Sequence, residues 1–275
     1  MKGYNELMES VAQVDLPGLE AFLVSGPDAL DWLQGQLTND VRLLENLDWL
    51  DSCLVKSTGQ LEGTVRLVNS EDGLVALTAF GGVLCDRFEK FVILEDVALT
   101  PLGLVNTSLQ GPDSQSVAPK GAWRSPRTGS DGWESLDPPN AFHGIVADFE
   151  AVSLTTLEMG VPIVGVDSNE KTLPPELGPS FTRDHVAFTK GCYVGQEVLQ
   201  RIHSRGHTNK EWGVYAATAE ITAGENVLCG GKAVGVVTRA AQRASGEWLC
   251  GAMVRHQSLG TLVTESGAEL SQFNR

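Results

Sequence analysis

A thiol and a phenol stand between two glycines in the run Lys190-Gly191-Cys192-Tyr193-Val194-Gly195-Gln196-Glu197. The glycines permit a close approach of the backbone, and the run from Gln196 onward has helical character, with Glu197 suited to a first turn. The amides of such a turn, together with Lys190, would favour the thiolate form of a nearby cysteine. Cys192 is therefore the candidate catalytic residue. The same run could also form a turn whose cysteine is merely buried.

A group of cations surrounds this run in the sequence. Local charges dominate within a Debye length of about 8 Å, so these cations could hold a small anion despite the acidic chain. They could equally be ordinary solvated side chains. The group comprises Arg183, Lys190, Arg201 and Arg205.

The Lys190–Glu197 run resembles the signature of the YgfZ-type family, whose members are relatives of the glycine-cleavage aminomethyltransferase. The resemblance extends to residues 25–40, which are similar to the opening helix of that family and its Gln-Gly-Gln-x-Thr-x-Asp turn. It continues through residues 201–210, which read RIHSRGHTNK. Order and spacing match over most of the chain except its middle.

The resemblance implies an α+β fold in which ferredoxin-like α/β units surround a central channel, closed by a C-terminal β-barrel. It implies a folate ligand, tetrahydrofolate or a related form, in that channel. It also implies a role in assembling or repairing iron-sulphur clusters in client enzymes, including enzymes that thiolate tRNA. Folate and iron-sulphur client enzymes are thus the expected partners.

Glu158 is the candidate contact for the pterin ring, because Leu157-Glu158-Met159-Gly160 resembles the segment through which aminomethyltransferases hold it. A carboxylate can accept two hydrogen bonds from the amino and ring N–H groups of a pterin. The alternative is an exposed glutamate at a helix end. The other candidate folate-binding residues are Lys190, Gly191, Tyr193, Gly195, Gln196, Glu197, Arg201, Arg205, Gln34, Gln36 and Asn39. The last three could line the channel with amide groups or could satisfy a turn.

One segment departs from the transferase pattern. Where the aminomethyltransferases carry an acidic pair on a strand, this chain reads Leu61-Glu62-Gly63-Thr64-Val65. Glu62 could be a displaced substitute, but a shift of one residue along a strand reverses the side chain's face. Methylene transfer by the usual mechanism is therefore not expected. The competing functions are a folate-dependent aminomethyltransferase or demethylase, and a non-catalytic, ligand-gated interaction module.

The elements that must position these residues follow from the pattern of apolar and turn residues. Strand character at residues 16–24 precedes a helix over 29–33, and a helix is also expected over 82–94. Short strands are expected at 52–56, 63–69, 74–79 and 97–102. Short apolar runs at 212–216, 226–229, 233–237, 248–254 and 261–264 predict a small β-barrel. We divide the chain into a folate-binding α/β region, 1–205, of two interleaved subdomains, and a barrel domain, 206–275.

Composition sets further limits. The chain has 275 residues and a formal net charge of -15, so long-range repulsion disfavours stable binding of nucleic acid. We see neither a secretory or mitochondrial leader nor an apolar stretch of about 18 residues, so we expect a cytoplasmic protein without membrane contact. Its five cysteines form no C-x-x-C pair and its five histidines lack a ligand spacing, so no metal site is expected.

Overall fold

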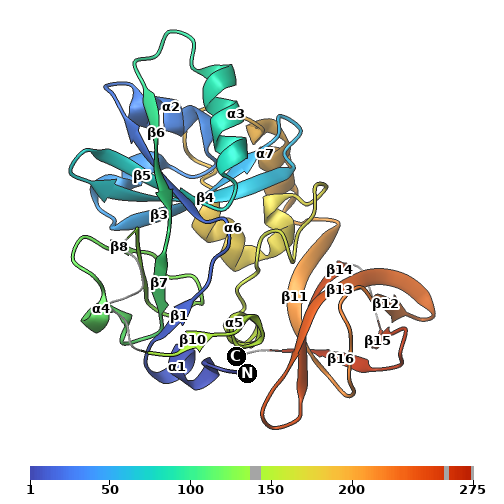
Figure 1. Ribbon diagram of the computed structural model, residues 1–275. Coiled ribbons are helices and arrows are strands. Elements are labelled where there is room, and N and C mark those ends of the chain that lie inside the picture. Colours follow the sequence, from blue (N-terminus) through green and yellow to red (C-terminus); the bar gives the residue numbers. More distant parts are fainter. Residues whose placement is uncertain (137–143, 257–259, 274–275) are drawn as a thin grey trace.

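The computed structural model describes residues 1–136, 144–256 and 260–273, and it is built from two five-stranded sheets and a closed barrel (Figure 1). The chain first forms strand β1 of one sheet and then all five strands of the other sheet, β2 to β6. It returns to the sheet of β1 with β7 to β10 and ends in the barrel. This mixed α+β architecture with a C-terminal barrel confirms the predicted fold class.

The upper sheet of Figure 1 has the strand order β3-β4-β5-β2-β6 and is antiparallel throughout. Its strands are β2 (Glu20–Ser25), β3 (Trp49–Val55), β4 (Leu61–Ser70), β5 (Gly73–Thr78) and β6 (Ala98–Leu104). The helices α2 (Ala29–Gln36) and α3 (Gly81–Phe91) and the 3-10 turn η1 (Val41–Glu45) lie with this sheet, and Trp32, Leu33 and Leu84 of the two helices enter its core. β2 begins later than predicted because Pro17 precedes a turn at Gly18, whose φ is 76°.

The lower sheet has the order β10-β1-β7-β9-β8. Its strands are β1 (Ala12–Val14), β7 (Thr107–Gln110), β8 (Trp123–Arg124), β9 (Gly132–Ser135) and β10 (Val146–Ala147). The helices α1 (Tyr4–Glu9), α4 (Ser114–Val117) and α5 (Phe149–Glu158) accompany it. α5 begins at the Asp148 side chain, which accepts a hydrogen bond from the backbone N–H of Ala151 at 2.8 Å.

Two helices and a turn lead from α5 into the barrel: η3 (Pro174–Leu177), α6 (Pro179–His185) and α7 (Gln196–Arg205). The barrel has the order β11-β14-β13-β12-β15-β16. Its strands are β11 (Lys210–Ala217), β12 (Asn226–Cys229), β13 (Lys232–Gln242), β14 (Trp248–Arg255), β15 (Leu262–Thr264) and β16 (Glu269–Gln272). The sequence did not reveal β16, since its four residues contain a single leucine. The domain division at residue 206 stays a prediction.

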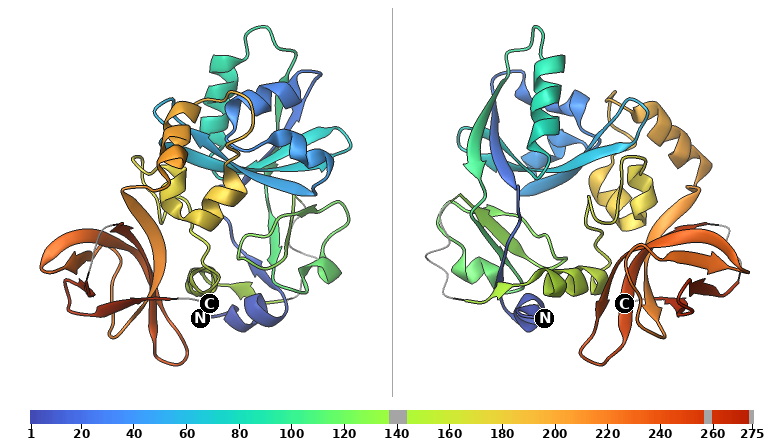
Figure 2. Two further views of the ribbon diagram at one scale, coloured as in Figure 1. Left: turned by 180° about the vertical axis from the view of Figure 1, so that it is seen from behind. Right: turned by 45° about the vertical axis from the view of Figure 1, so that its right-hand side comes forward.

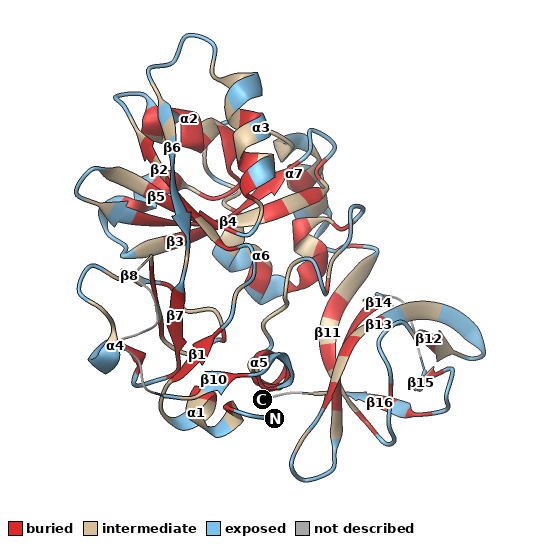
Figure 3. Ribbon diagram, in the orientation of Figure 1, coloured by how far each residue is buried: buried red, intermediate tan, exposed pale blue. Residues whose placement is uncertain are grey.

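One apolar cluster connects the upper sheet, α5, α6 and the barrel. Cys53, Leu154 and Trp212 are buried members that come from β3, α5 and β11. Figure 2 shows α5, in yellow-green, and α6, in yellow, between the sheets and the barrel, and Figure 3 shows buried residues along these elements. Within the described residues, no helix is long and apolar enough to cross a membrane. Cytoplasmic residence stays a prediction.

Candidate functional site

The two distant sequence motifs lie against each other. The backbone N–H of Val194 donates to the carbonyl of Gly35 at 3.1 Å. The Lys190 ammonium donates to the carbonyls of Leu37 and Asn39, both at 2.7 Å. These carbonyls follow the end of α2, where orphan backbone acceptors need partners. The 190–194 segment therefore clasps the end of the opening helix.

A second set of hydrogen bonds ties the same turn to β3 and α6. The Thr38 hydroxyl donates to the carbonyl of His185 at 2.6 Å and accepts from the N–H of Cys53 at 2.9 Å. The N–H of Ala187 donates to the carbonyl of Thr38 at 3.0 Å. Thr38 is fully buried, so these contacts replace water around it. These hydrogen bonds attach the turn after α2 to strand β3 of the upper sheet.

Burial lowers the pKa of Lys190 to about 8, although the nearby Asp40 carboxylate opposes the shift. Its ammonium also lies 5.0 Å from the centre of the Tyr193 ring. Tyr193 is 6% exposed, and its hydroxyl has no hydrogen-bond partner among the described residues. Burial raises the pKa of Tyr193 to about 12, so its hydroxyl stays protonated and can donate.

The two glycines of the motif have different structural roles. Gly195 caps the start of α7 with a φ of 82°, and a Cβ there would lie 2.5 Å from the carbonyl oxygen of Lys56. Gly191 is exposed and a Cβ there would meet nothing within 4 Å. Only Gly195 is required by the backbone. Gln196 begins α7 and Glu197 is exposed in its first turn, as the sequence predicts.

Cys192 is the one exposed cysteine of the five, all of which the structure describes. Burial raises the pKa of Cys250 to about 12 and raises that of Cys53 further. On α7, Arg201 and Arg205 are exposed, four residues apart and without an ion pair among the described residues. Cys192 is therefore the most exposed thiol in the chain, with Cys85 and Cys229 partly buried, and its reactivity stays a prediction.

Glu158 is the last residue of α5 and is 7% exposed, so it is not an exposed helix end. One carboxylate oxygen accepts from the Tyr4 hydroxyl at 2.6 Å, and the other accepts from Nε of Arg243 at 2.7 Å. Tyr4 belongs to α1, and Arg243 directly follows β13 of the barrel. Both oxygens thus already have protein partners, and a role toward pterin stays a prediction.

The three amide candidates differ in how they are satisfied. Gln34 donates to Asp40 at 2.8 Å and accepts from the N–H of Val41 at 2.8 Å. Asn39 donates to the carbonyls of Asp51 and Asp184, each at 2.8 Å. Both side chains therefore stabilise the turn after α2.

Gln36 has a different environment from the other two amides. It is 8% exposed, and the oxygen of its side-chain amide has no partner within the described part of the chain. It therefore has an unused buried acceptor that a ligand or water could satisfy.

The segment that departs from the transferase pattern has no room for an acidic side chain at position 63. A Cβ on Gly63 would lie 2.4 Å from Cγ of Phe80, so the phenylalanine ring fills the space of a side chain. Glu62 faces the other way and accepts from Arg87 at 2.6 Å. Arg87 also donates to the carbonyls of Gln36 and Val55. The carboxylate of this segment is therefore bound to a buried guanidinium.

Comparison with known proteins agrees with this arrangement. The chain is 26% identical to the tRNA-modifying protein YgfZ of Edwardsiella ictaluri over 213 residues, 66% of this chain and 64% of that protein. It is 21% identical to the tRNA-modifying protein YgfZ of Klebsiella pneumoniae over 225 residues, 71% of this chain and 68% of that one. No protein-family model matches the chain. Its fold matches that of the glycine cleavage system aminomethyltransferase T from Bartonella henselae with a TM-score of 0.84 at 18% identity, over 98% of this chain and 87% of the other.

The chain is similar in sequence to YgfZ-type proteins and shares the fold of the aminomethyltransferase. The matched region spans less than two thirds of the Edwardsiella relative, so the activity and partners of that protein enter only as proposals for this chain.

Sequence reasoning missed the buried charges of this chain. Arg66 binds both carboxylate oxygens of Asp51, at 2.7 and 2.6 Å. Burial acts to raise the pKa of Asp51, but Arg66 outweighs it and holds that pKa below its usual value. Arg66 also contacts Ser125, whose hydroxyl donates to Glu134 at 2.8 Å. Partners 15 and 59 residues apart carry no local sequence signal.

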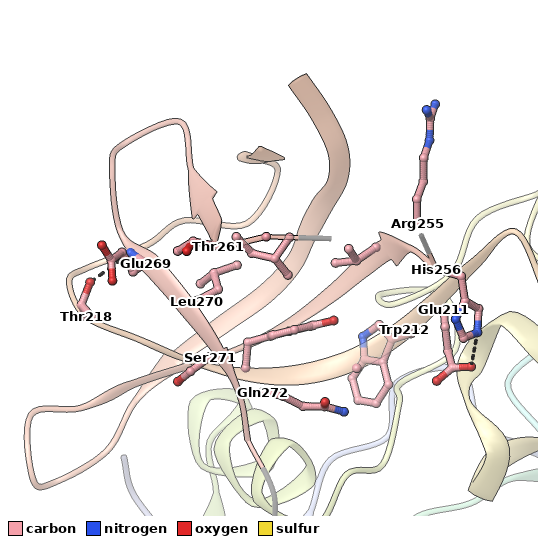
Figure 4. A pocket seen from close by; sticks show the side chains of 15 residues that line it. Glu211, Trp212, Thr218, Arg255, His256, Thr261, Glu269, Leu270, Ser271 and Gln272 are labelled. Carbon is pink, nitrogen blue, oxygen red and sulfur yellow. Dashed lines mark hydrogen bonds and ion pairs between the residues drawn. The ribbon is translucent and has the colours of Figure 1, made fainter. Parts of the chain in front are cut away.

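The barrel contains a pocket of about 830 Å³ (Figure 4). Its lining includes Trp212, Tyr215 and Leu270, with a contact of 3.2 Å between Glu211 and His256 at the edge. No residue of the predicted site lines it. No group of three or more metal-ligating side chains occurs among the described residues, and His143 lies outside them.

Proposed function

We propose that this YgfZ-type chain is a folate-binding accessory protein that supports assembly or repair of iron-sulphur clusters in client enzymes, including enzymes that thiolate tRNA. The observation that carries the proposal is the clasp between the 190–194 segment and the end of α2, which leaves Cys192 exposed beside it. The names of the relatives, tRNA-modifying protein, support the connection to tRNA modification.

In this proposal Cys192 is the reactive group and the clasp positions it. Lys190 supplies a cation on the same segment, held by two carbonyls, and Gly195 sets the start of α7. The exposed Arg201 and Arg205 are the proposed contacts for the anionic part of the ligand.

A folate fits the polar groups around Glu158, provided that it shares or replaces existing contacts. Each carboxylate oxygen can accept more than one hydrogen bond, and each has one protein donor now. The hydroxyls of Thr155 and Thr128 are buried without a partner in the described residues. Thr155 is on α5, one turn before Met159, which directly follows the helix. Gly129 is next to Thr128 in the sequence and approaches Met159, so the two threonines lie in segments that meet at this residue. When bound, a reduced folate supplies a one-carbon carrier, and these groups would hold its pterin ring.

The test is calorimetry and thermal melting with tetrahydrofolate. We expect saturable binding and, at 100 times Kd, a stabilisation of about 2.7 kcal/mol. Glu158→Gln should bind about tenfold more weakly or worse, because a charge-assisted hydrogen bond is lost. Tyr4→Phe, which releases one oxygen of Glu158, should bind at least as tightly as the wild-type protein. Folded protein that shows no heat of binding at millimolar tetrahydrofolate contradicts the proposal.

Methylene transfer of the glycine-cleavage type is not part of the proposal. Gly63 has no room for a carboxylate beneath Phe80, and Glu62 is paired with Arg87. Losing a positioned acid or base removes about 10²–10⁴-fold of rate. We expect no turnover of an aminomethyl-lipoyl carrier protein with tetrahydrofolate, and robust turnover would contradict this expectation.

A further inference from the structure

A groove of about 610 Å³ lies at one end of the upper sheet. It is bounded by the turn between β2 and α2, by η1 and by the turn between β4 and β5. Leu30, Leu44 and Leu74 supply apolar lining. The Asn69 amide of β4 donates a hydrogen bond to the carbonyl of Leu44 in η1 at 2.8 Å, which holds these two walls of the groove together. A groove of this kind can accept an apolar side chain without reorganising.

Acidic side chains dominate the rim. Arg42 is the one basic residue of the lining, and it is paired with Asp31 at 3.0 Å. Asp96 approaches from the loop after α3, where its N–H donates to the Asp28 carboxylate at 2.7 Å. The exposed carboxylates in or beside the groove are Asp28, Asp31, Glu45, Glu71, Asp72 and Asp96. The groove therefore combines an apolar interior with a strongly negative edge.

Exposed aliphatic side chains lie on segments that border the groove or contact it. Leu43 of η1 is 47% exposed and Leu47, just after η1, is 45% exposed. In the loop after α3, which packs against Gly26 of the groove through Asp96, Ile93 is 79% and Leu94 is 94% exposed. Such a concentration of exposed aliphatic groups is typical of a protein-binding surface.

We propose that this groove docks a basic segment of the iron-sulphur client enzyme, with lysine or arginine side chains on the rim and one apolar side chain inside. The proposal rests on the proposed function. A client that thiolates tRNA must carry a basic surface, since neutralising phosphates dominates its affinity for tRNA. A second copy of this chain would bring the same carboxylates together, and the net charge of -15 opposes that pairing. The same charges repel tRNA itself.

The experiment measures binding of the full chain to a purified tRNA-thiolating iron-sulphur enzyme of the same organism, by calorimetry at 50 and 150 mM NaCl. The groove variant is Glu45→Lys with Glu71→Lys, two exposed lining residues, one from η1 and one from the turn between β4 and β5, whose side chains make no hydrogen bond among the described residues. The control is Glu170→Lys with Glu220→Lys, which makes the same charge change at exposed positions elsewhere.

We expect the groove variant to bind about tenfold more weakly than the wild type at 50 mM NaCl, with a smaller salt dependence, and the control to bind normally. Equal binding by groove and control variants overturns the docking site. So does absence of binding by the wild type, or a concentration-dependent dimer in sedimentation that the groove variant abolishes. Folate binding and client activity are measured in parallel: if both survive while docking is unaffected by the groove variant, only the docking proposal fails.

Discussion

Replacing Gly195 by alanine should destabilise the protein far more than the same replacement at Gly191. Gly195 has a φ of 82°, which costs an L-residue about 1–2 kcal/mol. Its Cβ would also lie 2.5 Å from the carbonyl oxygen of Lys56 and 2.8 Å from Cγ2 of Val55, and relieving such overpacking costs about 1–3 kcal/mol. The expected loss of unfolding free energy is thus about 2–5 kcal/mol.

The matched control is Gly191→Ala in the same loop. A Cβ on Gly191 would meet no atom within 4 Å, and the φ of this residue is outside the left-handed range, so the change should be neutral or stabilise by up to about 1 kcal/mol. Urea unfolding and thermal melts of both variants measure the difference. For a chain of this size the Gly195 variant should melt at least about 4 °C lower.

The clasp itself supplies a second readout. If Gly195→Ala shifts the 190–194 segment, the Lys190 contacts with Leu37 and Asn39 should weaken, and client activity should fall below that of the Gly191 variant at equal folded protein. Equal stability of the two variants would refute the reasoning, because it would mean that the start of α7 tolerates a different backbone.

Three further changes test other parts of the structure. Cys192→Ser should leave the melting temperature within about 1 °C of the wild type yet impair client enzymes, and iodoacetamide should label Cys192 before Cys53; equal client activity would reduce this thiol to a structural role. The pKa of Lys190 is lowered to about 8, so between pH 8 and 10.5 the unfolded chain binds more protons than the folded chain. As the pH rises through this range, the unfolding free energy of the wild type should therefore increase relative to that of Lys190→Met. Urea titrations in which the difference in unfolding free energy between the two proteins does not change with pH would contradict this. Arg66→Met should cost about 3–5 kcal/mol by leaving Asp51 buried without its partner, and a loss below about 1 kcal/mol in urea unfolding would contradict the pairing.

The sequence predicted the features that local patterns encode. Helix and strand periodicity placed α2, α3 and most strands of the upper sheet, and the spaced apolar runs after Gly206 predicted the barrel. The two motifs pointed to the YgfZ proteins that the chain resembles and to the cysteine that is exposed. The departure of residues 61–65 from an acidic pair could also be read from the chain, although the ring of Phe80 against Gly63 could not.

Tertiary structure decided which polar groups are available. Glu158 has a helix-end pattern in the sequence, but packing between α1 and the barrel gives its oxygens to Tyr4 and Arg243, 154 and 85 residues away. Gln34 and Gln36 are nearly identical in local context, yet one is satisfied by the turn and the other keeps an unused oxygen. Periodicity reports which face of an element is buried, because burial follows the local geometry of helix and strand. The partner of a buried polar group depends on how elements distant in the chain meet, and only the folded structure determines that.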